Sequence, residues 1–244
     1  MRDLERNAWQ DRGAVGEYVE SVRSQAPVNE WIEKPALRML VGEVHGLALL
    51  DLGCGPGDFT RACMDAGAAS LIGVDSSAEM LRHAPALRHV RYVHATMETL
   101  ERPPASVDLV YSSMALHFME GVSDVFSRTA AWIRPGGHLV VTIEHPLVAA
   151  TSRGDWIDDG RGALAWSVDQ SLEEGPRRDQ RGDLVIVGWH WSVSSRITMA
   201  GAAGFQLERL VEPCGVQDGW QQALAVMAKN HGRPAILGMR LTPD

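Results

Sequence analysis

One short stretch near residue 50 constrains the fold of this chain more than any other. The apolar run 47–52 is followed by a loop with three glycines, Gly53-Cys54-Gly55-Pro56-Gly57, and then by a helical pattern from about Asp58. Such a run predicts a buried parallel strand. The glycines permit a tight turn and a close backbone approach to a ligand, because no Cβ stands in the way. The stretch therefore predicts a strand–loop–helix unit whose first free N–H groups point at a ligand.

A second apolar run, 70–75, ends in Asp75, where a carboxylate can accept both hydroxyl groups of a ribose. The glycine spacing differs from the G-x-G-x-x-G pattern of dinucleotide sites, and Asp51 and Asp58 flank the loop. Two carboxylates would repel a pyrophosphate. The pattern therefore indicates a nucleoside attached to an amino acid rather than a diphosphate.

Four sequence blocks carry a resemblance to a known family. They are 50–57 (LDLGCGPG), 73–81 (GVDSSAEML), 108–117 (DLVYSSMALH) and 132–137 (WIRPGG). In order and spacing they resemble the class I S-adenosylmethionine (SAM)-dependent methyltransferases, in the branch that acts on small molecules. The resemblance covers roughly residues 45–145 and implies S-adenosyl-L-methionine as cofactor and methyl transfer as the reaction.

Strands and helices alternate along the chain, which is typical of a parallel sheet with helices on both faces. We expect strands near 47–52, 70–75, 90–95, 107–112, 137–144, 205–211 and 235–241, and helices near 58–67, 77–84, 121–133, 193–203 and 217–229. The resemblance implies an α/β fold with a Rossmann-like, mostly parallel seven-stranded sheet and an antiparallel last strand.

We expect the whole chain, 1–244, to form a single domain with two additions. The first is an N-terminal helical arm over 1–45, with a short helix around 15–22 and another over 28–45. The second is an insertion at about 146–192. Its first part, 146–183, is rich in glycine and charge and lacks a strand or helix pattern, which predicts a long loop that acts as a lid.

The resemblance also assigns residues to the cofactor. It implies that the glycine block lies against the methionine part of SAM, that the acid after the second strand binds the ribose, and that its neighbours flank the adenine. The matching residues are Asp51, Gly53, Gly55, Gly57, Asp75, Ser76, Met80, Thr96, Met97, Ser112 and Ser113. Asp75 could instead cap the next helix, although Ser77 is better placed to do so. Thr96 stands where the family often has an acid, and the two serines could be plain strand-end residues.

Methyl transfer is an in-line displacement that depends on positioning the acceptor against the methyl carbon. A general base helps only where the acceptor must lose a proton. The catalytic candidates are His117, His145 and His190, each able to titrate near neutral pH. The alternative for each is a structural histidine bonded to the backbone.

The substrate-binding candidates are Tyr18, Glu144, Trp166, Trp189 and Trp191. Tyr18 lies in the arm that folds over the cofactor in relatives, and flat tryptophan rings attract aromatic or cationic ligands. Core packing is the alternative for the tryptophans. The acceptor atom can be oxygen, nitrogen or a nucleophilic carbon, and the tryptophans favour an aromatic or heteroaromatic acceptor, as in specialised metabolism.

Composition limits the partners. With 23 Lys and Arg against 31 Asp and Glu, the formal net charge is −8, and no basic cluster could follow a nucleic-acid backbone. The three cysteines show no metal-ligand spacing and fit a reducing compartment, and no apolar run is long enough for a membrane span. We therefore expect a cytoplasmic monomer or homodimer with a small-molecule acceptor, and no metal, nucleic-acid or membrane partner. The alternatives are a protein or RNA methyltransferase and a non-catalytic SAM-binding regulatory subunit.

Overall fold

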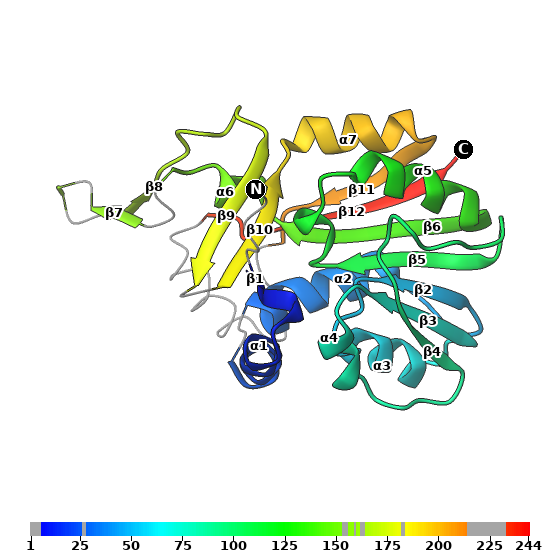
Figure 1. Cartoon of the computed structure of the whole chain (residues 1–244). Coiled ribbons are helices and arrows are strands. Elements are labelled where there is room, and N and C mark those ends of the chain that lie inside the picture. Colours follow the sequence, from blue (N-terminus) through cyan, green and yellow to red (C-terminus); the bar gives the residue numbers. More distant parts are fainter. Residues whose placement is uncertain are drawn as a thin grey trace.

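The computed structural model describes residues 6–25, 28–152, 156–158, 160–161, 164–181, 184–213 and 233–244. Its centre is a seven-stranded sheet in the order β11-β12-β6-β5-β2-β3-β4 (Figure 1). Six strands run parallel, and β12 (Ile236–Pro243) runs antiparallel to both of its neighbours. The predicted Rossmann-like sheet with an antiparallel last strand is therefore confirmed.

The other strands of this sheet lie close to their predicted positions. They are β2 (Ala48–Leu52), β3 (Ser70–Asp75), β4 (Val90–His94), β5 (Val107–Ser113), β6 (Ile133–Glu144) and β11 (Phe205–Val211). β6 begins earlier than predicted. Its pairing with β5 skips from Ile133 to His138, so that the intervening Pro-Gly-Gly turn bulges out of the ladder without ending the strand.

Helices cover both faces of the sheet, and β2 shows why. Leu49 packs in one hydrophobic cluster with α2 (Lys34–Val41) and α3 (Asp58–Asp65). Leu50 and Leu52 pack in the other cluster, with α5 (Val122–Trp132) and α7 (Val193–Ala202), which lie above the sheet in Figure 1. Successive side chains of a strand point to opposite faces, so a strand buried on both faces has an unbroken apolar sequence.

The described part of the N-terminal arm is largely helical, and it packs on α4 and on the segment after β3. A short turn, η1 (Ala8–Gln10), precedes α1 (Arg12–Gln25). Two valines of α1 pack on Met80 of α4 (Ala78–Arg82), and Gln10 Nε2 donates to the Ser76 carbonyl oxygen at 2.8 Å. One π-helical turn, η2 (Asn29–Glu33), then continues into α2.

The prediction of a patternless loop over 146–183 is wrong. The segment begins with α6 (Pro146–Ala149) and contains a hairpin of β7 (Trp156–Asp158) and β8 (Leu164–Trp166), which projects from the body in Figure 1. A second hairpin of β9 (Gly175–Arg181) and β10 (Leu184–His190) joins β1 (Arg6–Asn7) in a three-stranded sheet. The sequence of β9, GPRRDQR, is polar throughout and gives no apolar alternation.

The predicted helix at 217–229 lies outside the described residues, and so does Cys214, one of the three cysteines. The lid role of the insertion stays a prediction. No helix in the part of the chain that the structure describes is long and apolar enough to cross a membrane.

Candidate active site

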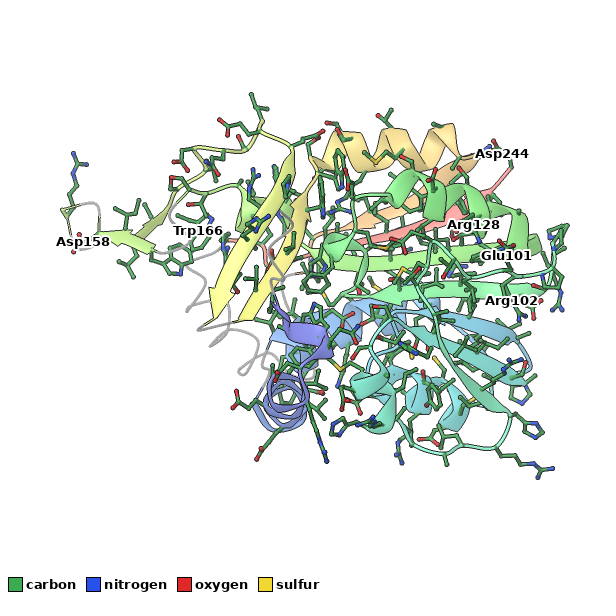
Figure 2. The ribbon with its side chains drawn as sticks, viewed as in Figure 1. Glu101, Arg102, Arg128, Asp158, Trp166 and Asp244 are labelled. Carbon is green, nitrogen blue, oxygen red and sulfur yellow. The ribbon has the colours of Figure 1, made fainter. Side chains whose placement is uncertain are left out.

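Two cavities meet at the carboxyl ends of the central strands. The first, of about 310 Å³, lies around the ends of β2, β3 and β5 and the segment after β4. The second, of about 1060 Å³, lies between the N-terminal arm, the end of β6 and the insertion, where Figure 2 labels Trp166. They have five lining residues in common, here called the shared wall: Trp9, Tyr18, Asn29, Met114 and Phe118.

The glycine loop forms the floor of the first cavity. Gly53 has a φ of +78°, and a Cβ at this position would lie 2.3 Å from the Ala115 Cβ, so only glycine fits without a backbone shift. Gly55 also lines the cavity, and its N–H donates to Asp75 Oδ2 at 2.8 Å. Gly57 does not line it; this glycine is the left-handed N-cap of α3. The loop thus brings its backbone to the cavity, as the sequence predicts.

Asp75 is held at the end of β3 by the backbone. Its Oδ2 accepts from Gly55, and its Oδ1 accepts from the N–H of Ser77 at 2.8 Å. Ser77, not Asp75, caps α4, because its Oγ accepts from the Met80 N–H at 3.0 Å. Burial raises the pKa of Asp75. Each carboxylate oxygen has a second lone pair, so Asp75 can still accept hydrogen bonds from a ligand in the cavity.

Asp51 lies deeper in the same cavity. It is 2% exposed, its Oδ2 accepts from Thr60 Oγ1 at 2.8 Å, and burial raises its pKa to about 7. The titratable residues that line this cavity are Glu33, Asp51, Asp58, Asp75, Glu98, Lys34 and the Tyr18 and Cys54 side chains. Five carboxyl groups against one ammonium group favour a ligand that carries positive charge.

The remaining cofactor candidates divide into two groups. The first cavity is lined by Ser76, Met80, Thr96, Met97 and Ser113. The structure does not bring Ser112 to the cavity: it is fully buried, and its Oγ donates to the Leu52 carbonyl oxygen at 2.8 Å. Side chains alternate along β5, so two adjacent serines cannot both face the ligand.

Comparison with known proteins decides the family. A family model described as "Methyltransferase domain" matches residues 50–141. An S-adenosylmethionine-dependent methyltransferase from Mesorhizobium loti, known from a crystal structure, is 35% identical with a TM-score of 0.79, and the match covers 86% of this chain and 96% of that one. This chain belongs to the class I SAM-dependent methyltransferases.

Two curated proteins are also similar to this methyltransferase. An uncharacterized protein from Haemophilus influenzae is 31% identical over 198 residues, which is 76% of this chain and 78% of that protein. Trans-aconitate 2-methyltransferase from Azoarcus sp. is 33% identical over 126 residues, which is 48% of this chain and 49% of that protein. The second match therefore spans only about half of each protein.

The first cavity fits the cofactor of the family. SAM carries a sulfonium and an ammonium group against a single carboxylate, which matches the acidic lining. Asp75 could hold the ribose, and Ser76, Met80, Thr96 and Met97 could surround the adenine. The glycine loop could lie against the methionine part, since Gly53 and Gly55 both line the cavity.

The raised pKa of Asp51 gives an expected pH dependence of SAM binding. Below pH 7 the carboxyl is largely protonated in the free methyltransferase, and a cationic ligand favours its ionised form. SAM affinity should therefore rise as the pH increases through about 7, by at most about tenfold per pH unit for one coupled proton. Calorimetry at pH 6, 7 and 8 measures this. The Asp51→Asn variant should show a flatter profile, and an equally flat profile in the parent would contradict the prediction.

Among the candidate bases, only His117 lines a cavity, the second one. Its Nδ1 accepts a long bond, 3.4 Å, from the Glu144 N–H. Burial, and after it the nearby Arg196 guanidinium, lower the pKa of His117 to about 3. An imidazole with this pKa stays neutral at physiological pH and is a weak base.

The other two histidines do not line either cavity. His145 is 3% exposed: its Nδ1 accepts from the Leu147 N–H as the N-cap of α6, and its Nε2 lies 2.9 Å from Glu212 Oε1. His190 is 2% exposed, and its Nε2 donates to the Ser171 carbonyl oxygen at 3.1 Å. Neither imidazole therefore reaches a cavity in this structure, and a catalytic role for either of them stays a prediction.

Four of the five substrate candidates line the second cavity: Tyr18, Glu144, Trp166 and Trp189. Trp166 is fixed there by a 2.8 Å bond from its Nε1 to the Leu147 carbonyl oxygen. Trp191 does not line the cavity; it packs against the main core, and its Nε1 donates to the Met119 carbonyl oxygen at 3.5 Å. Of the two roles considered for Trp191, the structure favours core packing over substrate binding.

Sequence reasoning missed the part of the first cavity that comes from the N-terminal arm, namely Trp9, Asn29, Glu33 and Lys34. One signal could have found the last three. The apolar residues Ile32 and Leu37 of this arm are five positions apart in the sequence. On one face of an α-helix, apolar residues recur every three or four positions. The extra residue indicates a π-helical turn, and such turns occur frequently at functional sites.

Proposed function

We propose that this methyltransferase binds SAM in the first cavity, with the ribose on Asp75, and methylates a small molecule bound in the second cavity. The shared wall carries this proposal, because two ligands that contact the same five side chains lie next to each other. The similarity to a methyltransferase named for trans-aconitate, a small tricarboxylate, supports the class of acceptor.

The lining of the second cavity supports a flat acceptor with polar groups. Trp166 and Trp189 both line this cavity, and flat conjugated or aromatic molecules pack well on indole rings. Glu144 and Gln170 add polar groups to the same wall. The Arg177 guanidinium is already engaged by the carbonyl oxygens of the insertion, so it builds the wall and is not left over for a ligand.

The reaction we propose depends on positioning. Bound SAM supplies an electrophilic methyl group. The shared wall would hold the acceptor in line with it, which can supply several kcal/mol, and would exclude water. His117 has too low a pKa to remove a proton efficiently near pH 7. We therefore propose an acceptor atom that is nucleophilic without losing a proton to a histidine.

We expect His117→Asn to change kcat by less than about tenfold, whereas loss of a true general base costs about 10²–10⁴-fold. The asparagine oxygen can still accept the Glu144 N–H. Steady-state kinetics across pH 5–9 measures this, with His45→Asn, which lines neither cavity, as the matched control. A hundredfold loss of kcat together with a lost pH inflection would restore His117 as the base.

The proposed function is tested by measuring S-adenosylhomocysteine release with three groups of acceptors. The first holds small carboxylic acids, beginning with trans-aconitate, and aromatic hydroxyl, amine and indole compounds; the second is total tRNA; the third is a protein extract. We expect turnover with a compound of the first group only. Turnover with RNA or protein favours a macromolecular methyltransferase, and tight SAM binding without any turnover favours a regulatory subunit.

We also propose that the protein acts in the cytoplasm, as a monomer or homodimer and without a nucleic-acid or membrane partner. The acidic net charge supports this, and so do Cys54 and Cys63, which are buried free thiols.

A further inference from the structure

Two adjacent side chains of opposite charge face the first cavity where the π-helical turn η2 continues into α2. Glu33 and Lys34 both line it, and so does Asn29 at the start of the turn. Ile32 faces the other way and packs on Ile236 of β12. The turn is thus anchored by an apolar residue while its polar residues face the ligand, and nothing in the family's glycine and ribose motifs accounts for this pair.

Glu33 is buried, and only one of its two carboxylate oxygens accepts hydrogen bonds from residues that the structure describes. The residue is 1% exposed, and its Oε1 accepts from Ser113 Oγ at 2.9 Å and from Thr142 Oγ1 at 2.5 Å. Its Oε2 accepts no hydrogen bond from any residue that the structure describes, and no described Lys, Arg or His forms an ion pair with it. A buried carboxylate without a cation is costly, and burial raises its pKa accordingly.

Lys34 is the only ammonium group among the residues that line this cavity. Its Nζ pairs with Glu30, whose side chain is 44% exposed. Exposed ion pairs of this kind contribute little, so Lys34 can exchange this partner for a ligand carboxylate at small cost.

The order of the strands places this pair at one end of the cavity. Asp75 ends β3 and Thr96 follows β4, and these strands lie on one side of β2. Ser113, which holds Glu33, ends β5 on the other side of β2. A ligand whose ribose lies on Asp75 and whose adenine lies towards β4 therefore extends its far end towards Glu33.

We propose that Glu33 and Lys34 bind the amino-acid end of SAM, with the Glu33 carboxylate accepting from its ammonium group and Lys34 donating to its carboxylate. The proposal rests on the placement of the ribose at Asp75 made under the proposed function. It explains why an acid and a lysine stand side by side, because the amino-acid end is itself a zwitterion. It also explains the two hydroxyl donors on Glu33 Oε1, which fix the carboxylate so that Oε2 points its lone pairs at the ligand.

Two ligands separate this role from a purely structural one. S-adenosylhomocysteine carries the amino-acid end, and 5′-methylthioadenosine carries the same adenosine and thioether without it. We expect Glu33→Gln to weaken S-adenosylhomocysteine binding by about tenfold or more and to change 5′-methylthioadenosine binding by less than twofold. Lys34→Met should show the same selectivity. Glutamine keeps an oxygen for Ser113 and Thr142, so the fold should be retained.

Competition calorimetry with both ligands is the measurement, and Glu43→Gln is the matched control, since Glu43 is an acid that lines neither cavity and whose Oε1 also accepts a hydrogen bond, from the His45 N–H. Asp75→Ala tests the underlying placement, and it should weaken both ligands. Equal weakening of both ligands by Glu33→Gln, or no weakening of S-adenosylhomocysteine by either variant, would overturn the proposal while leaving the ribose site intact. If Asp75→Ala leaves both ligands unchanged, the ribose placement fails instead.

Discussion

Gly53→Ala should cost this methyltransferase both its cofactor binding and a large part of its stability. The added Cβ would lie 2.3 Å from the Ala115 Cβ and 3.0 Å from the Met97 Cε, and the backbone has a φ of +78°. The left-handed conformation costs an alanine about 1–2 kcal/mol, and overpacking adds about 1–3 kcal/mol. The loop cannot simply move away, because the Gly53 N–H donates to the Val74 carbonyl oxygen at 2.8 Å. We expect the free energy of unfolding to fall by about 2–5 kcal/mol and S-adenosylhomocysteine binding to weaken about 100-fold or more.

Gly46→Ala is the matched control for this prediction. Gly46 has nearly the same φ, +77°, but a Cβ there would meet no atom within 4 Å, and the residue lines neither cavity. It should lose about 1–2 kcal/mol of stability and bind S-adenosylhomocysteine as the parent does. Urea unfolding and calorimetry give the two quantities. Parent-like binding by Gly53→Ala would show that the loop does not approach the cofactor.

Asp75→Ala should weaken SAM binding by about 1.5–3 kcal/mol, which is about 10–150-fold. A charged acceptor for the ribose hydroxyls is lost, and the Gly55 N–H loses the bond that holds the glycine loop beside it. The Ser77 N–H also loses its acceptor, so stability should fall by about 1–2 kcal/mol.

Asp108→Ala separates the two effects. Asp108 also accepts from a backbone N–H, that of Ala48 at 2.7 Å, and it pairs with Arg134, but it lies at the amino end of the sheet and lines neither cavity. It should lose comparable stability and keep parent-like SAM affinity. If both aspartate variants bind SAM equally well, Asp75 is a structural residue only.

The sequence predicted those strands, helix caps and helix ends whose signals lie within a few adjacent residues. Apolar runs such as 47–52 and 70–75 give strands wherever a parallel sheet is buried on both faces, and β2 and β3 lie within a residue of them. Ser77 caps α4 and Gly204 follows α7 in a left-handed conformation, because caps and helix ends depend on a few adjacent residues. The glycine loop and Asp75 are local signals of the same kind, and they were enough to predict where the first cavity lies.

The orientation of the histidine side chains could not be predicted from such local signals. His117 and His145 both follow strands at the carboxyl edge of the sheet, as predicted. The sequence does not determine the direction in which each imidazole points. His145 turns to cap α6 and to meet Glu212, and the half-buried His117 lies near Arg196 of α7. The low pKa of His117 comes first from burial and then from Arg196, and both arise only in the folded chain.

What the sequence by itself determined is therefore the sheet, the glycine loop with its two acids, and the family. Only the tertiary structure decided three features: the pairing of β1 with β10, the extended conformation of the polar β9, and the position of Glu33, which accepts hydrogen bonds from Ser113 and Thr142. The reason is physical: periodicity and caps act over a few residues and are written in them. Strand pairing, burial and charge depend on segments far apart along the chain, and these meet only once the chain has folded.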